Sequence, residues 1–74
     1  MTYAERIRAL REVAGKTQSE VAALLNVGQR TYCDYERGKI RIPVDSLIIL
    51  ARLYDVSMDY ISGVSDVPSL FPQK

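Results

Sequence analysis

The side chains of this chain that could do chemistry are hydrogen-bonding groups rather than catalytic ones. Gln29 and Arg30 stand next to each other, and Asp34 follows four residues after Arg30. Such side chains can read the edges of nucleic-acid bases, because arginine bonds guanine bidentately, glutamine does the same with adenine, and aspartate accepts a hydrogen bond from cytosine. Asp34 could instead hold Arg30 in place, since residues four apart meet on one helix face. The plainer alternative for Gln29 and Arg30 is a solvated polar surface, and Asp34 could equally be repelled by phosphates.

The chain lacks the residues that most enzymatic reactions need. Its 74 residues include no histidine and one cysteine, Cys33, so the commonest general base and metal ligand is missing. The sequence has no glycine-rich phosphate loop and no metal-ligand cluster. We therefore expect no enzyme, no cofactor and no metal. Without basic neighbours that clearly activate it, Cys33 is expected to be a surface residue rather than a redox switch, and an unpaired cysteine fits a reducing cytoplasm.

The composition is that of one small globular domain. It is 47% hydrophobic and 26% charged, and no apolar run approaches the roughly 18 residues of a membrane-spanning helix. The start, Met1 to Arg6, has no basic region followed by an apolar one, so we expect no secretory signal. So short a chain buries a small core, which favours association with a partner such as a second copy. The initial methionine and the irregular tail favour a complete small protein over a fragment of a longer one.

The net charge of +1 is divided unevenly along the chain. Residues 1–41 hold eight Lys or Arg and five Asp or Glu, a net of +3, whereas residues 42–74 hold two and four, a net of −2. A basic front half suits contact with phosphates, and an acidic back half suits solvent or a partner. Chance variation in a short chain is the alternative.

Hydrophobic spacing predicts five helices and no strand. The predicted helices run from about Tyr3 to Ala14, from Gln18 to Leu25, from Gln29 to Arg37, from Pro43 in its first turn to about Tyr54, and from Ser57 to Gly63. Thr2 with Glu5, and Thr17 with Glu20, have the spacing of a capping box. Left-handed residues are expected at the helix ends, at Gly15, Asn26 and Gly63. The second helix is expected to bury Val21, Ala22, Leu24 and Leu25.

The stretch from Thr17 to Gly38 is the most informative part of the chain. Two short helices are separated by the turn Asn26–Val27–Gly28, and apolar residues on both sides of the turn point into a shared core. This arrangement is a helix-turn-helix, in which the second helix keeps its far face free. A helix fits the major groove of B-DNA, so residues 29–37 are expected to form a recognition helix.

An ordered set of motifs carries a resemblance to a known family. The motifs are Thr17-Gln18-Ser19-Glu20-Val21-Ala22, Asn26-Val27, Tyr35-Glu36-Arg37-Gly38-Lys39, Leu50-Ala51 and Val56-Ser57-Met58-Asp59-Tyr60-Ile61-Ser62-Gly63. Together they strongly resemble the Cro/C1-type (XRE-like) helix-turn-helix family from about Ala4 to Gly63. The resemblance implies an all-α, five-helix, lambda-repressor-like domain at residues 1–63, with the helix-turn-helix at about 17–37, and an irregular tail at 64–74.

The resemblance also implies a function. Members are bacterial or phage transcriptional regulators, here expected to be a repressor that binds double-stranded operator DNA at the nucleoid, usually as a homodimer. Three positions depart from the common pattern: Asn26 where glycine often begins the turn, Gly28 where serine or threonine often begins the recognition helix, and Tyr32 at a usually apolar position. The hydroxyl of Tyr32 needs a hydrogen-bond partner if it is buried.

Further residues are expected to contact the phosphate backbone or to support the recognition helix. Thr17 and Gln18 begin the second helix, whose positive dipole end suits a phosphate, and by resemblance Gln18 clamps the backbone. Three basic residues could clamp the next phosphates, although any one could be a solvated charge: Arg37, Lys39 and Arg41. By resemblance, Arg11 and Glu36 form a buried structural ion pair.

The acidic end of the chain carries a candidate dimer contact. Packing into the core is the default for its apolar residues, whereas the resemblance implies a two-fold contact that places two recognition helices about 34 Å apart. The candidates are Tyr54, Met58, Tyr60, Ile61 and, in the tail, Phe71. A protein-interaction module, such as an antitoxin or adaptor with a protein partner, is the competing interpretation. A DNA reader loses affinity steeply as salt rises, whereas an adaptor should bind DNA weakly and without sequence preference.

Overall fold

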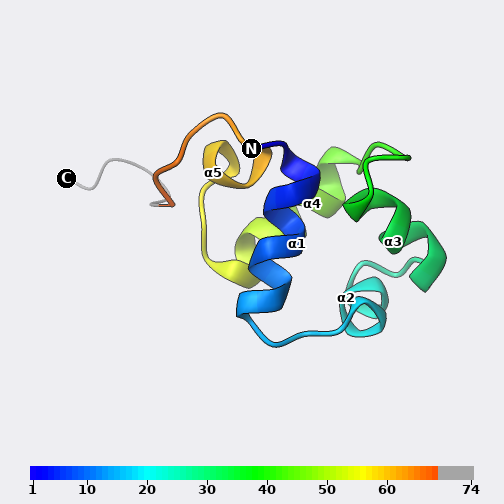
Figure 1. Ribbon diagram of the computed structural model, residues 1–74. Helices are drawn as coiled ribbons and strands as arrows, with labels where there is room; N and C mark the ends of the chain where they lie inside the picture. The colour runs from blue at the N-terminus through cyan, green and yellow to red at the C-terminus, as the bar shows by residue number, and fades with distance from the viewer. Residues whose placement is uncertain (69–74) are drawn as a thin grey trace.

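The computed structural model describes residues 1–68, in which the chain forms five helices and no strand (Figure 1). The helices are α1 (Tyr3–Val13), α2 (Gln18–Leu24), α3 (Gln29–Glu36), α4 (Val44–Tyr54) and α5 (Met58–Ser62). α2 packs closely on α3, α1 contacts both α3 and α5, and α4 contacts α5. None of the described helices has the length and apolar character needed to cross a membrane.

The first two helices begin at the predicted capping boxes. At α1 the backbone N–H of Thr2 donates to Glu5 Oε1 (2.9 Å), and the Glu5 N–H donates to Thr2 Oγ1 (3.2 Å). At α2 the corresponding distances between Thr17 and Glu20 are 2.7 and 3.0 Å. Each box satisfies two backbone donors that a helix end leaves free. These hydrogen bonds to backbone N–H groups lower the pKa of Glu5 and of Glu20.

The other helix ends agree with the sequence in part. Ser57 Oγ accepts from the Tyr60 N–H at 3.0 Å and so caps α5 as expected. Pro43 was expected in the first turn of α4, but it lies one residue before the helix as its N-cap, because its ψ of 149° is extended. Asp55 ends α4 with a φ of 57°, a left-handed conformation that aspartate tolerates and that the sequence did not reveal.

The apolar sides of all five helices meet in one core. Its fully enclosed side chains are Ile7, Val21, Tyr32, Leu50 and Ile61. The prediction that Leu24 would be buried is wrong, because Leu24 is 51% exposed. At about 100° per residue, Leu24 points roughly 100° away from the direction shared by Val21, Ala22 and Leu25, and seven-residue α2 buries only that one side.

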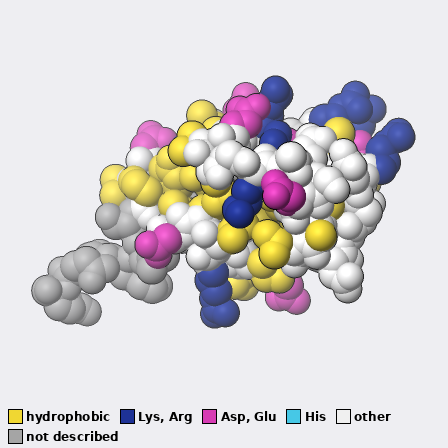
Figure 2. All heavy atoms as spheres, turned by 90° about the horizontal axis from the view of Figure 1, so that it is seen from below, with side chains coloured by type: hydrophobic (Ala, Val, Ile, Leu, Met, Phe, Trp, Pro, Cys, Tyr) yellow, Lys and Arg dark blue, Asp and Glu magenta, His cyan; other side chains and the backbone are white. Residues whose placement is uncertain are grey.

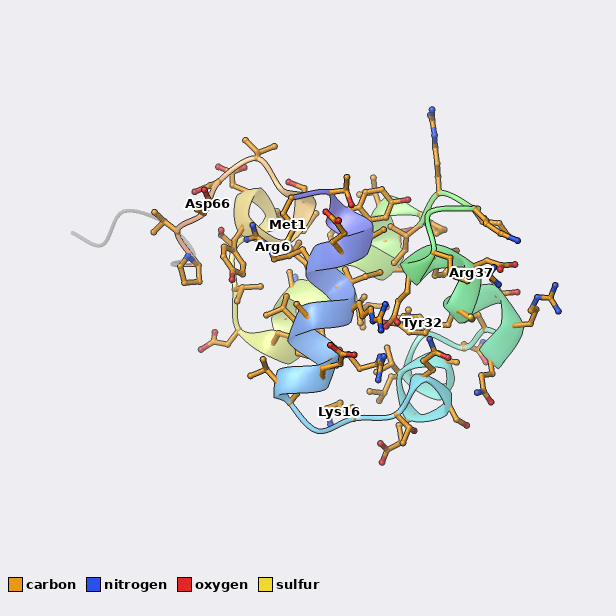
Figure 3. The ribbon with its side chains drawn as sticks, in the orientation of Figure 1. Met1, Arg6, Lys16, Tyr32, Arg37 and Asp66 are labelled. Atoms are coloured by element: carbon orange, nitrogen blue, oxygen red, sulfur yellow. The ribbon has the colours of Figure 1, made fainter. Side chains whose placement is uncertain are left out.

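Residues 64–68 follow α5 without regular structure, as expected, but they are bound to the body of the domain. Arg6 of α1 is 4% exposed and donates to the Tyr60 carbonyl oxygen (3.0 Å), the Ser65 carbonyl oxygen (3.4 Å) and Asp66 Oδ1 (3.1 Å). Its guanidinium carbon also lies 3.9 Å from the centre of the Tyr60 ring. Figure 3 shows Arg6 between Met1 and Asp66 on one flank of α1. Arg6 therefore joins α1, α5 and the tail.

Replacement of Arg6 tests this anchor. Arg6→Ala should lower the free energy of unfolding by about 2–3 kcal/mol, because buried hydrogen bonds from a charged donor and the packing of its stem are lost together. Thermal and urea unfolding monitored by circular dichroism measure the change. The matched control is Arg8→Ala on the same helix, whose exposed pair with Glu12 should contribute less than about 0.5 kcal/mol. Equal effects of the two substitutions would contradict the assignment.

Candidate nucleic-acid interface

α3 has one buried side and one exposed side, as its sequence predicted. Tyr32, Tyr35 and Glu36 are 0%, 4% and 8% exposed. The rings of Tyr32 and Tyr35 meet edge to face, with their centres 6.2 Å apart and their planes at 84°, a favourable arrangement for aromatic pairs. Figure 3 shows Tyr32 in the interior, between α3 and α1. The opposite side of α3 is thus left free, while the helix itself is held firmly.

The exposed side begins with the residues that the sequence singled out. Gln29 and Arg30 form the first turn of α3, and both are exposed. Gly28 caps the helix without a side-chain hydrogen bond, so no side chain occupies the start of α3. Together, the two adjacent side chains present hydrogen-bonding groups at the tip of a fixed helix.

In the structure without DNA, Asp34 lies close to Arg30. Its side chain is only 14% exposed, and its Oδ2 lies 3.8 Å from Nε of Arg30, whose side chain is 85% exposed. Its Oδ1 is buried and accepts no hydrogen bond from the described residues. Asp34 therefore lies beneath Arg30 and attracts it electrostatically, at a distance too long for a hydrogen bond.

The inner side of α3 is fixed by an ion pair that also engages α2. Arg11 Nε donates to Glu36 Oε2 at 2.7 Å, and Arg11 Nη2 donates to Glu36 Oε1 at 3.2 Å. This is the pair that the family resemblance implied. Gln18 Nε2 donates to the same Oε1 at 3.1 Å, a contact that the sequence analysis missed. Gln18 was expected only as a phosphate clamp, yet its amide also completes the shell of hydrogen bonds around Glu36.

The surroundings of Glu36 shift the pKa values of neighbouring groups. Burial alone would raise the pKa of Glu36, but hydrogen bonds from Arg11 and Gln18 help to outweigh it, so the pKa lies below its ordinary 4.5. Burial, followed by the nearby Glu36 carboxylate, raises the pKa of Tyr32 far above its ordinary value. Burial likewise raises the pKa of Tyr54 to about 12. At neutral pH this cluster therefore combines a charged pair with two neutral tyrosines.

Three basic side chains follow the C-terminal end of α3. Arg37, Lys39 and Arg41 are all exposed, and the loop that carries them folds back on α3, because the N–H groups of Lys39 and Ile40 both approach the Asp34 carbonyl oxygen (3.0 and 3.4 Å). In Figure 2, dark-blue side chains gather at the end of the molecule opposite the grey tail. This end carries the positive charge expected of a surface that meets phosphates.

The expected dimer residues lie mostly inside the domain. Ile61 is fully buried, so its side chain belongs to the core of one copy and is not available to a second. Tyr54, Met58 and Tyr60 are half-buried and pack against that core. Phe71 lies outside the described residues. Among residues 1–68, no group of three or more acidic residues or cysteines is placed to hold a metal ion.

Comparison with known proteins agrees with this geometry. The helix-turn-helix family model matches residues 7–61. The chain belongs to the Cro/C1-type helix-turn-helix family. The uncharacterized HTH-type transcriptional regulator YobD of Bacillus subtilis is 42% identical over 66 residues, 89% of this chain and 59% of YobD. The HTH-type transcriptional regulator ImmR of the same organism is 39% identical over 67 residues, 90% of this chain and 53% of ImmR. The chain thus spans little more than half the length of these relatives.

Solved structures show the same fold. A transcriptional regulator from Listeria innocua matches with a TM-score of 0.80 and 29% identity, over 99% of this chain and 62% of that one. The P22 c2 repressor, in a crystal structure with a synthetic operator, matches with a TM-score of 0.74 and 24% identity, over 82% of this chain and 92% of that one. The all-α, five-helix, lambda-repressor-like fold predicted from the sequence is confirmed.

Removal of Arg11 tests its structural role. Arg11→Ala should destabilise the domain by about 3–5 kcal/mol, because it leaves the buried Glu36 carboxylate without its counter-ion. Urea unfolding measures the loss. The double variant Arg11→Met with Glu36→Leu should recover much of it, since an apolar pair leaves no buried charge. An unchanged midpoint for Arg11→Ala would show that the ion pair does not hold α3.

The lowered pKa of Glu36 predicts a dependence of stability on pH. A carboxylate whose pKa is lower in the folded state stabilises that state fully above its unfolded pKa of about 4.3, and this contribution is lost as the pH falls through the folded pKa. The difference in unfolding free energy between the wild type and Glu36→Gln should therefore be constant near pH 7 and shrink below about pH 4. Urea unfolding of both proteins from neutral to acidic pH measures it, and a difference that persists at the lowest pH would contradict the assignment.

Proposed function

We propose that this chain binds double-stranded operator DNA and represses transcription, with α3 in the major groove. The observation that carries the proposal is that one helix has two different sides. Gln29 and Arg30 are exposed on one side, and Glu36 forms a buried ion pair with Arg11 on the other. A side chain discriminates between bases only if its backbone is held in place, because a loosely held donor can adapt to several base edges. α3 is eight residues long and is held by hydrogen bonds from α1 and α2.

Each group of exposed residues has a proposed task. Gln29 and Arg30 contact base edges. Asp34 aligns Arg30 from below and itself makes little direct contact with the bases. Phosphates are held by residues on both sides of α3, namely Thr17 and Gln18 on one side and Arg37, Lys39 and Arg41 on the other. These phosphate contacts give most of the affinity, whereas the contacts of α3 give the sequence preference.

A homodimer is part of the proposal. One α3 has few base-reading side chains, so one copy is expected to discriminate modestly, and two copies on a palindromic site double the number of base pairs read. Met58, Tyr60 and Tyr54 are half-buried rather than enclosed, so the α5 end retains some surface for a second copy. The domain proposed for this task comprises residues 1–63, acting on the genome in the cytoplasm.

Selection of bound sequences from a random pool of duplex DNA tests the function. A palindrome with half-sites about one helical turn apart is expected, because a two-fold dimer places its recognition helices about 34 Å apart. The affinity for the selected site should fall steeply as the salt concentration rises. A pool without an enriched motif, or weak binding without sequence preference, would contradict the proposal and favour a protein-interaction module.

Two single substitutions should affect this binding in different ways. Arg30→Ala should weaken binding to the selected site by about 1–3 kcal/mol and relax the preference at one base pair, because a base contact is lost. Lys39→Ala should weaken binding about equally on all sequences and reduce the salt slope by about 1, because a phosphate contact is lost. Fluorescence anisotropy on selected and scrambled duplexes at several salt concentrations measures both. If Arg30→Ala weakened both duplexes equally, Arg30 would not be a base contact.

A further inference from the structure

The outer side of α4 is a mixed apolar and charged surface that no part of the described chain covers. Ile49 and Leu53 are 44% and 36% exposed, and Asp45 and Arg52 are exposed beside them. The inner side of the same helix supplies Leu47, Leu50 and Ala51 to the core. In Figure 1, the first turn of α4 lies beside the end of α3, and the rest of α4 runs behind α1. The proposed contacts with DNA therefore leave most of this surface free.

The charges on this surface are arranged so that it complements itself. Asp45 and Arg52 are seven residues apart, which places them on nearly the same line along the helix, about 10 Å from each other. If two α4 helices pack antiparallel across a two-fold axis, Asp45 of each copy faces Arg52 of the other. Ile49 lies beside this line and close to the middle of the segment, so the two Ile49 side chains meet near the axis. A two-fold contact requires such a self-complementary pattern.

Two observations favour a second copy of this chain as the occupant. Neither Asp45 nor Arg52 takes part in any of the ion pairs formed within residues 1–68. Their placement near the two helix ends also suits the helix dipole, but the dipole gives no reason for Ile49 and Leu53 to face water. A helix side with two exposed large apolar side chains, Ile49 and Leu53, and a symmetric pair of opposite charges fits an identical helix better than solvent.

We propose that the outer side of α4 is a self-association surface, on which two copies pair antiparallel through two reciprocal Asp45–Arg52 contacts around Ile49. α4 has 11 residues and is therefore about 16 Å long, so the contact is smaller than a standard stable interface and is weak. It differs from the contact expected for the operator-bound dimer, which uses Tyr54 at the end of α4 together with Met58 and Tyr60 of α5.

A weak contact of this kind becomes effective when copies are held close together. Copies bound at adjoining sites on one DNA molecule have an effective concentration in the millimolar range, far above that of free protein. Pairing through α4 would then favour joint occupation of neighbouring operators. This consequence rests on the proposed DNA binding, whereas the self-association itself does not.

Charge reversal in the absence of DNA tests the self-association. Amide chemical shifts of the full chain are recorded by NMR from about 20 µM to about 2 mM, a range that captures weak dissociation constants. Concentration-dependent shifts are expected along the outer side of α4. Asp45→Arg alone and Arg52→Asp alone each place like charges opposite each other twice, and should raise the dissociation constant about tenfold. The double variant Asp45→Arg with Arg52→Asp restores opposite charges and should restore the association.

The outcomes separate this proposal from the proposed function. Rescue by the double variant, with shifts confined to α4, would support the antiparallel contact. Absence of concentration-dependent shifts, shifts confined to Met58 and Tyr60 at the α5 end, or failure of the double variant to restore association would overturn it. Ile49→Asp serves as a second probe, since it removes the apolar centre without touching either charge and should also abolish the shifts. Because DNA is absent, failure to bind an operator would not affect any of these results.

Discussion

The Glu36 carboxylate is the point on which the arrangement of the first three helices depends. Arg11 of α1 and Gln18 of α2 both donate to it, and Arg11 Nη1 also donates at 2.8 Å to the carbonyl oxygen of Lys16, in the connection between these helices. One buried acidic group on α3 thus collects donors from both elements that precede it. A buried carboxylate is costly unless its oxygens are satisfied, so only one placement of α3 against α1 and α2 is acceptable.

This constraint explains how so short a helix can present a fixed surface. An isolated helix of eight residues is unstable in water, so α3 exists because of its tertiary contacts. Tyr32 and Tyr35 supply apolar burial, which is not directional, whereas hydrogen bonds to Glu36 are directional and fix the rotation of the helix about its axis. The rotation decides which side chains face outward, and here these are Gln29 and Arg30.

The features that could be predicted from the sequence are those set by neighbouring residues. Capping boxes at Thr2 and Thr17 depend on residues three apart, and the burial of Tyr32 follows from helical spacing. Arg6 was missed because its partners lie more than 50 residues away in α5 and the tail. Long-range hydrogen bonds leave no periodic trace in the sequence.

Rigid and adjustable parts are divided between the two sides of α3. The inner side is held by hydrogen bonds of 2.7–3.2 Å to Glu36, whereas Arg30 on the outer side lies 3.8 Å from Asp34 and is 85% exposed. Arg30 can therefore move away from Asp34 without breaking a hydrogen bond. The backbone of α3 is thus held in place by its inner side, while the charged tip of Arg30 on the outer side stays free to move.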